Sequence, residues 1–394
     1  MSNITRKFWK PSVTSQFRIC PVPFHFDTYR GCTYGCLFCF ARDFIVFSRR
    51  NAEESHRRQS FLEGNSPQGL ERWCERVTKG GYDYTKAAEV AFKERIPVKI
   101  GATADPFPVC EKEERITYDC LKVFGRYDYP VQISTKNPEV FLSYAEEFKD
   151  ANIALNVSCS FCDDDVAQRI ECGAISPTRR FEAIRKLSKM GFRITVRIQP
   201  FILPYSEKAA ERFIRTLKEH GVWGFQTEGL KIRMVMSQKE KDIYRRIGDV
   251  FGFDILSDFK EHGMIEGGDR CYSIEDKRRM LSLYTELGER YGVRFFNADN
   301  LIDPKYGCGS ECCGTEFLRN HKIWGGSRRS LAFNDGRERC SEELGKCLVN
   351  FTRSKANAQK TIAEVSAEFN KTETKRLQDI EKKSKEPTEG EIFT

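Results

Sequence analysis

The sequence predicts an α/β protein built around a full or partial parallel barrel. Short runs rich in β-branched and apolar residues alternate with longer segments whose apolar residues recur at helical spacing. Several of the short runs are almost continuously apolar, which is typical of parallel strands that are covered on both faces. The alternation indicates repeated βαβ units around one parallel sheet.

The expected elements follow one another along most of the chain. Strands are predicted over 24–29, 97–103, 130–135, 153–159, 193–200, 230–235 and 293–298. Helices are predicted over 111–127, 176–191 and 206–221. Ser176 and Gly191 mark the start and end of the second helix, and Ser206 and Gly221 those of the third.

Segments outside this rhythm suggest how the chain is divided. We expect an N-terminal segment over 1–22, a barrel over 23–300 and a cysteine-rich extension over 301–350, followed by a charged helix and tail over 351–394. Within the barrel, residues 40–96 form a long polar insertion rich in Arg and Glu.

Composition limits the class of protein and its location. Of 394 residues, 40% are hydrophobic and 31% charged, and no apolar run reaches the length of a membrane span. The first residues, MSNITRKFWKPS, lack the apolar core of a signal peptide, so we expect a cytoplasmic protein with no membrane partner. In a reducing compartment, clustered members of the sixteen cysteines favour metal binding over disulfides.

The charge of the chain favours anionic partners. The formal net charge is +8, and the segment RRNAEESHRR at 49–58 is rich in arginine. Both features favour a nucleic acid or nucleotide substrate, although much of the Lys and Arg excess is interleaved with Asp and Glu, as on a solvated surface.

A loop with three cysteines is the main chemical signal. Cys32, Cys36 and Cys39 lie in YRGCTYGCLFCFAR, directly after the first predicted strand, where α/β barrels carry their active sites. A structural zinc site needs four protein ligands, and the nearest further candidates are Cys20, His56 and Cys74. A [4Fe–4S] cluster held by three cysteines would leave one iron open to a small molecule.

This C-x3-C-x2-C pattern, with Phe38 as the aromatic residue before the last cysteine, resembles the radical S-adenosylmethionine (SAM) superfamily. The resemblance implies a barrel of the radical SAM type and a [4Fe–4S] cluster on Cys32, Cys36 and Cys39 whose open iron binds SAM. It also implies that one electron cleaves SAM to methionine and a 5′-deoxyadenosyl radical, which abstracts hydrogen from a substrate. Reduced flavodoxin or ferredoxin is the implied electron donor.

Further motifs narrow the resemblance to one branch. Over about residues 20–300 the chain is similar to spore photoproduct lyase and its DNA repair photolyase-like relatives, through the motifs YRGCTYGCLFCFAR, GATADPFPVCEKEERIT, ISTKNP, NVSCSF and RIQPFILP. In this branch Lys136 matches a residue that holds the carboxylate of SAM and Ser158 one near its ribose. Phe38 and the backbone of Phe40 would flank the adenine.

Each of these positions has a structural alternative. Lys136 fits an exposed loop lysine, and Ser158 fits the cap of a strand end. Asp105 could orient SAM or substrate, or could form an Asp-Pro turn. Arg197 lies within a β-rich run, where an arginine is costly unless it faces the site or an acidic partner, and we interpret it as facing the site.

The sequence also departs from the branch. Spore photoproduct lyase carries a hydrogen-donating cysteine three residues before the aspartate of this motif, where this chain has Ala102. Phe40 stands where a tyrosine often follows the last cysteine. Both differences put thymine-dimer repair by the lyase mechanism in doubt.

A second group of cysteines follows the barrel. It could bind a second Fe–S cluster or zinc, or it could consist of free thiols: Cys308, Cys312, Cys313, Cys340 and Cys347.

The sequence therefore supports a radical SAM enzyme that acts on a nucleobase or nucleic acid. Two alternatives stay open: a radical SAM enzyme that acts on a peptide or small molecule, and a non-catalytic zinc-binding module that binds nucleic acid.

Overall fold

The structure is a computed structural model of the 394-residue chain. It describes residues 4–43 and 62–340, apart from positions 82, 84, 267, 310–311 and 334–335, together with isolated helical positions between 371 and 382. The arginine-rich segment 49–58, Cys347 and nearly all of the predicted C-terminal helix and tail lie outside the described residues.

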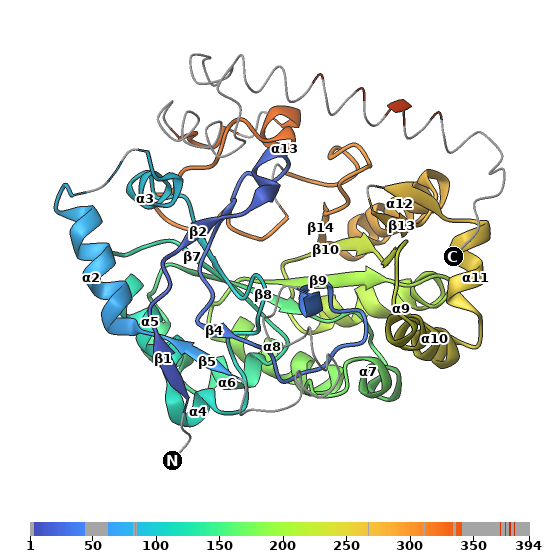
Figure 1. Ribbon diagram of the computed structural model, residues 1–394, viewed down its shortest axis with the longest axis horizontal. Coiled ribbons are helices and arrows are strands. Elements are labelled where there is room, and N and C mark those ends of the chain that lie inside the picture. Colours follow the sequence, from blue (N-terminus) through green and yellow to red (C-terminus); the bar gives the residue numbers. More distant parts are fainter. Residues whose placement is uncertain are drawn as a thin grey trace.

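An eight-stranded sheet forms the centre of the molecule (Figure 1). Neighbouring strands pair in parallel, except that β2 runs antiparallel to β3. In spatial order the strands are β14 (Arg294–Asn297), β10 (Gly224–Gly229), β9 (Ile194–Phe201), β8 (Ile153–Ser158), β7 (Val131–Thr135), β6 (Val98–Ile100), β3 (Phe24–His25) and β2 (Ser12–Val13). Within the described chain β14 and β2 are unjoined edges, so the predicted α/β architecture is confirmed as a partial barrel.

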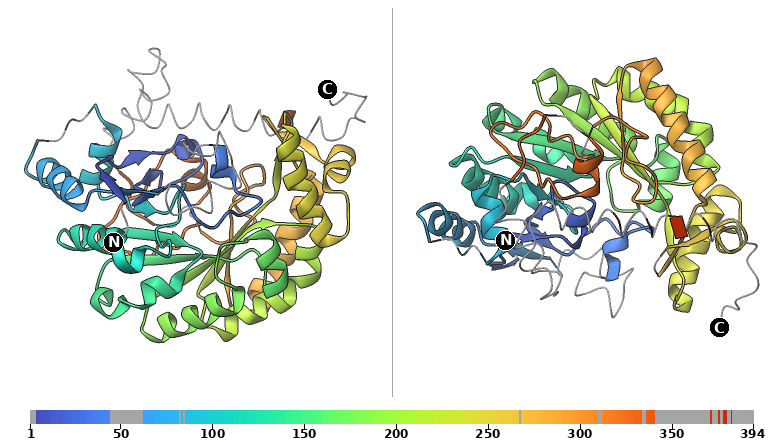
Figure 2. Two further views of the ribbon diagram at one scale, coloured as in Figure 1. Left: turned by 60° about the horizontal axis from the view of Figure 1, so that its bottom comes forward. Right: turned by 90° about the horizontal axis from the view of Figure 1, so that it is seen from above.

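Helices cover the outer face of this sheet (Figure 2). The α-helices are α2 (Pro67–Thr78), α3 (Ala87–Lys93), α4 (Glu111–Glu114), α5 (Ile116–Gly125), α6 (Pro138–Leu142), α7 (Asp164–Ile170), α8 (Pro177–Lys189), α9 (Tyr205–Glu219), α10 (Gln238–Phe251), α11 (Ile255–Glu261), α12 (Ile274–Tyr291) and α13 (Arg328–Ala332). Short 3-10 helices are η1 (Ser15–Arg18), η2 (Phe40–Asp43) and η4 (Ala145–Phe148). No helix of the described part is long and apolar enough to cross a membrane.

Two small sheets flank the main one. The first consists of β1 (Thr5–Lys7), β5 (Glu63–Asn65) and β4 (Tyr29–Arg30), and the second of β11 (Lys231–Arg233), β13 (Asp269–Cys271) and β12 (Met264–Glu266).

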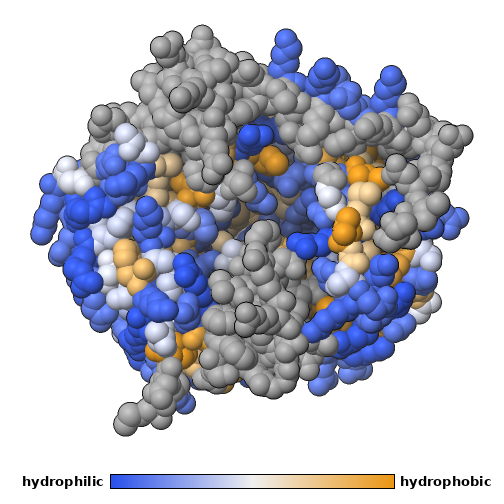
Figure 3. Space-filling view, viewed as in Figure 1, coloured by the Kyte–Doolittle hydropathy of each residue, from blue (hydrophilic) through white to orange (hydrophobic). Residues whose placement is uncertain are grey.

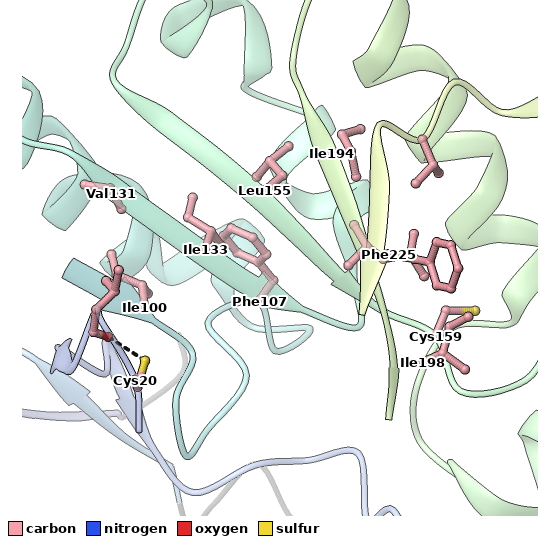
Figure 4. Packing of buried hydrophobic residues seen from close by; sticks show 14 of the residues in the cluster. Cys20, Ile100, Phe107, Val131, Ile133, Leu155, Cys159, Ile194, Ile198 and Phe225 are labelled. Atoms are coloured by element: carbon pink, nitrogen blue, oxygen red, sulfur yellow. Dashed lines mark hydrogen bonds between the residues drawn. The ribbon is translucent and has the colours of Figure 1, made fainter. Parts of the chain in front are cut away.

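Alternation along the strands gives the main sheet two unlike faces. Outward side chains such as Val131, Ile133, Leu155 and Ile194 join the buried apolar core beneath the helices (Figure 4). The alternate positions point into the barrel and are mostly polar. We call their side the lumen, and define it by Gln132, Ser134, Asn156, Ser158, Arg197 and Gln226.

Two strand predictions need correction. The predicted strand 24–29 is divided between β3 and β4, which belong to different sheets, because the chain turns at Asp27, whose carboxylate accepts from the backbone of Ala102. The run 230–235 contains β11, which belongs to the small antiparallel sheet. The barrel strand at this point is β10, whose sequence GFQTEG lacks the apolar run that marks a buried strand.

The helix predictions hold with two differences. The segment 111–127 forms α4 and α5, separated at Arg115, whose φ of 50° is left-handed. The third helix begins at Tyr205, and the Ser206 hydroxyl accepts from the backbone N–H of Ile202. Of the predicted insertion, the described part holds β5, α2 and α3, and α2 packs against α5.

The described part of the extension joins the two edges of the sheet. Trp324 is fully buried, and its indole N–H donates to the carbonyl of Phe17, 2.8 Å away, beside β2. Arg329 donates to the carbonyls of Asn297 and Asp299, at the end of β14. Residues 300–340 therefore close the gap between β14 and β2 by side-chain and loop contacts.

Gly101 should tolerate no side chain. Its φ is +89°, and a Cβ there would overlap the carbonyl oxygen of Ser134 on β7. Gly101→Ala should therefore lower the free energy of unfolding by about 2–4 kcal/mol, measured by chemical denaturation. Gly125→Ala is the control, because no atom lies within 4 Å of its Cβ position and alanine favours the helix. Equal effects of the two substitutions would contradict this account.

His321 should make stability fall in acid. Burial, with the nearby Arg337 charge, lowers the pKa of His321 to about 4, and its ring also bonds the Leu318 carbonyl at 2.6 Å. Because the folded-state pKa is depressed, the unfolded state binds the proton first, and stability should fall between pH 6.5 and 4. Chemical denaturation across this range should show a smaller fall in His321→Gln, whereas an identical pH dependence would contradict the assignment.

Candidate functional site

The three-cysteine loop lies at the carboxyl ends of the barrel strands. It runs from the end of β4 at Arg30 to η2. The Tyr34 hydroxyl donates to the carbonyl of Phe107, after β6, at 2.5 Å. On the other side, Leu37 N–H donates to the carbonyl of Ile170 at 2.9 Å. These contacts hold the loop between the segments that follow β6 and β8, as predicted for an active-site loop.

Glycines allow the loop to turn and to pack closely. Gly31 and Gly35 have φ values of 89° and 57°, in the region that glycine adopts at no steric cost. Gly173 donates to the Tyr34 carbonyl at 2.8 Å, and a Cβ on Gly173 would lie 2.7 Å from the Thr33 carbonyl oxygen. The backbone of the loop is thus packed against the segment that contains Gly173.

The chemistry of the three side chains fits an iron–sulfur cluster. All three are free thiols, Cys36 is buried, and Cys32 and Cys39 are partly exposed. Burial, with the charge of Asp105, raises the pKa of Cys32 to about 12, and burial also raises that of Cys36. Iron binding supplies the positive charge that deprotonates such thiols.

Among the described residues, no three His, Cys, Asp or Glu side chains are placed to hold a single metal ion. An iron–sulfur cluster requires a different ligand geometry, because each cysteine binds a different iron. The three sulfurs therefore need not converge on one point.

An ion-pair network centred on the buried Glu171 lies next to the loop. Glu171 lies 2.6 Å from Arg180 and 3.1 Å from the ammonium of Lys136, and its side chain is 1% exposed. Burial alone would raise the pKa of Glu171, but the charges of Arg180 and Lys136 lower it below its ordinary value. The Lys136 ammonium also lies 5.4 Å from the centre of the Phe38 ring. Lys136 is therefore a half-buried, ion-paired residue at the loop rather than an exposed loop lysine.

Asp105 organises the turn after β6. Its carboxylate accepts from the backbone N–H of Lys136 at 2.6 Å, from the Thr135 hydroxyl at 2.8 Å and from Phe107 N–H at 3.0 Å. Since these donors come from two neighbouring strand ends, Asp105 joins the β6 and β7 loops, which fits the turn alternative. A role of Asp105 in orienting SAM stays a prediction.

The remaining predicted residues lie around the mouth of the lumen. Ser158 ends β8 and is paired in register with Arg197 on β9. Phe38 is half-buried against Phe161, with 6.3 Å between ring centres, whereas the Phe40 side chain is 66% exposed. The space-filling view shows the molecule hollowed near its centre (Figure 3). Binding of SAM by these residues stays a prediction.

Of the second cysteine group, the structure describes Cys308, Cys312, Cys313 and Cys340, and among these only Cys312 and Cys313 interact with each other. Cys312 and Cys313 have sulfurs 3.9 Å apart, and the hydrogen bond between them lowers the pKa of Cys312 to about 7. Cys308 instead donates to the Phe295 carbonyl, and the backbone of Cys340 bonds that of Ile323. A second cluster or zinc site on these residues stays a prediction.

Sequence reasoning missed several residues that complete the site. Arg180 was detectable, because it falls on the buried face of α8 with Pro177, Phe181 and Ile184. Glu171, in contrast, lies in a short connection whose partners come from distant segments. The buried carboxamide of Asn156 was hidden by the apolar context of its strand, and that of Gln226 lies on β10, which the sequence did not mark as a strand.

Comparison with known proteins identifies the domain. Residues 27–217 match the model of the radical SAM superfamily, and no curated protein matches the chain. A solved structure of spore photoproduct lyase with AdoMet and dinucleoside spore photoproduct is 13% identical, with a TM-score of 0.48, over 73% of this chain and 80% of that one. Streptococcus suis SuiB is 12% identical, with a TM-score of 0.43, over 72% of this chain and 50% of the other.

These structural similarities are too weak to support conclusions about function, whereas the family match spans the cysteine loop and the strands from β4 to β9. Residues 27–217 therefore form a domain of the radical SAM superfamily.

Proposed function

We propose that this protein reductively cleaves SAM at a [4Fe–4S] cluster held by Cys32, Cys36 and Cys39 and abstracts hydrogen from a nucleobase or nucleic acid. The superfamily implies both cofactors. The observation that carries the proposal is the loop itself, with three free thiols at C-x3-C-x2-C spacing, fixed at the carboxyl ends of the parallel strands. When bound, the cluster supplies the electron that cleaves SAM.

Residues of this chain have three tasks in the proposal. The loop thiols hold the iron, while Glu171 and Arg180 fix the segment beneath the loop. Lys136 is the proposed partner of the SAM carboxylate, because its ammonium is held beside Phe38 and Cys36. Ser158, at the end of β8, and Phe38 are proposed to contact the ribose and adenine.

The choice of substrate rests on charge and motifs. The net charge of +8 and the motifs of the DNA repair photolyase-like branch favour nucleic acid over a peptide or small molecule. A reduced flavodoxin or ferredoxin is the proposed electron donor. Ala102 has no S–H bond from which a substrate radical could take hydrogen, so we propose chemistry other than that of the cysteine-dependent lyase.

The test of this function is anaerobic reconstitution with iron and sulfide, followed by incubation with dithionite and SAM. We expect 5′-deoxyadenosine from the wild-type protein. A colourless protein that contains stoichiometric zinc and forms no deoxyadenosine would instead favour the nucleic-acid-binding module.

Replacement of Cys32, Cys36 or Cys39 singly by Ala should abolish deoxyadenosine formation and remove most iron from this site, because each thiolate binds one iron. Iron analysis and chromatography of the reaction products measure both effects. Cys74→Ala is the control, since this buried cysteine belongs to helix α2. Deoxyadenosine formation at the wild-type rate in any loop variant would refute the assignment.

Lys136→Met should raise the dissociation constant of SAM about tenfold or more and leave the iron content unchanged, because it removes a cation beside the loop. Equilibrium dialysis on reconstituted protein gives the constant. Lys186→Met, at an exposed position of α8, should leave SAM affinity unaltered. If Lys136→Met binds SAM as the wild type does, Lys136 serves only its ion pair with Glu171.

A further inference from the structure

Arg197 is an arginine near the centre of the sheet that has no partner among the described residues. It lies on β9, between β8 and β10, and its register partners are Ser158 and Gln226. The side chain is half-buried and points into the lumen, where its Nε atom is buried and unpartnered. It forms no hydrogen bond or ion pair with any other described residue.

The surrounding carboxylates do not compensate for this charge. Strands β8 and β10 contribute one acidic side chain, Glu228, and this accepts from Gln199 and forms an ion pair of 2.9 Å with Lys231. An arginine cannot lose its proton when it is desolvated, so an unpaired guanidinium inside a barrel is costly.

Other buried cations of this chain are treated differently. Arg180 lies 2.6 Å from Glu171, and Lys277 lies 2.8 Å from Asp299, in pairs that are almost fully buried. In both pairs the chain supplies a carboxylate, and the buried Arg329 instead donates to the backbone carbonyls of Asn297 and Asp299. Arg197 has neither kind of partner among the described residues, which indicates that its counterion arrives with a ligand.

The neighbouring side chains indicate the chemistry of the rest of that ligand. Asn156 and Gln226 are 0% and 1% exposed, and both the oxygen and the nitrogen of each carboxamide lack a partner among the described residues. A carboxamide with a free donor and a free acceptor matches the edge of a nucleobase. Phe296, the register partner of Gln226, adds a buried aromatic ring to the same layer.

We propose that the lumen binds one nucleotide unit of the substrate, with Arg197 on its phosphate and Asn156 and Gln226 on the edge of its base. The inference rests on the proposed function and deepens it. It assigns Arg197 to the substrate rather than to SAM, for which Lys136 is already placed. A planar guanidinium suits a phosphate because it donates two parallel hydrogen bonds. An enzyme that acts on a base within a polymer takes that nucleotide out of the stack, which is why we assign a single unit to the lumen.

The test measures binding of the four nucleoside 5′-monophosphates and the matching nucleosides to the anaerobically reconstituted full-length protein. Wild type should bind at least one monophosphate more tightly than its nucleoside. Arg197→Met should raise the dissociation constant of that monophosphate about ten- to a hundredfold, and Arg197→Lys should restore part of the affinity. Affinity for the nucleoside and for SAM should stay at the wild-type level.

Stability provides an independent readout. Removal of an unpaired, half-buried cation should leave the melting temperature of Arg197→Met equal to or above that of wild type. Arg185→Met, at an exposed position of α8, should change neither binding nor melting. A lower melting temperature, or failure of Arg197→Met to fold, would make Arg197 a structural residue and overturn the proposal.

Other outcomes would overturn it differently. If Arg197→Met lost affinity equally for the nucleoside and the monophosphate, Arg197 would not contact the phosphate. If it lost affinity for SAM alone, Arg197 would be a cofactor-binding residue. Binding of an acidic peptide but of no monophosphate would assign the lumen to a peptide substrate. Deoxyadenosine formed by the same wild-type preparation shows whether the proposed function holds, independently of these results.

Discussion

The ion pair between Glu171 and Arg180 fixes the segment on which the cysteine loop rests. Arg180 reaches Glu171 from α8 and also donates to the carbonyls of Ile175 and Ser158, at 2.9 and 3.0 Å. It thereby joins a barrel helix, the end of strand β8 and the connection that packs against the loop. Such a buried pair adds little net stability compared with apolar packing, but removal of one partner leaves an uncompensated charge. The ion pair instead positions the cysteine loop, because the loop backbone bonds Ile170 and Gly173, on either side of Glu171.

The outer face of the central sheet stabilises the fold, and the inner face carries the polar side chains of the site. Outward side chains are aliphatic or aromatic and pack beneath the helices, so burial of apolar surface holds the barrel together from outside. Inward side chains are mostly polar, and several lack partners among the described residues. Unsatisfied buried groups destabilise a fold, so their concentration on one face indicates a site adapted to a ligand at some cost in stability.

The gap between the two edges of the sheet is spanned by the cysteine-rich extension and the N-terminal segment. The sheet stops at β14 and β2, and the extension spans the gap through Trp324 and Arg329. It also places Cys312 and Cys313 near Lys99 of β6 and Cys20 of the N-terminal segment. Three of these side chains are thiols from segments almost 300 residues apart, a neighbourhood that the spacing of cysteines along the chain does not reveal.

Local sequence determined the parallel α/β architecture, most strand positions and the cysteine loop. Each of these follows from short-range pattern: continuous apolar runs for buried strands, helical spacing for α8 and α9, and cysteine spacing for a cluster. Tertiary structure decided which polar segment becomes a barrel strand and which charged side chains are paired. It placed the barrel strand β10, whose polar and glycine-rich sequence becomes a strand only between β9 and β14. It paired Lys136 with Glu171, and it left Arg197 without a carboxylate, because a charge finds its partner through contacts between distant segments.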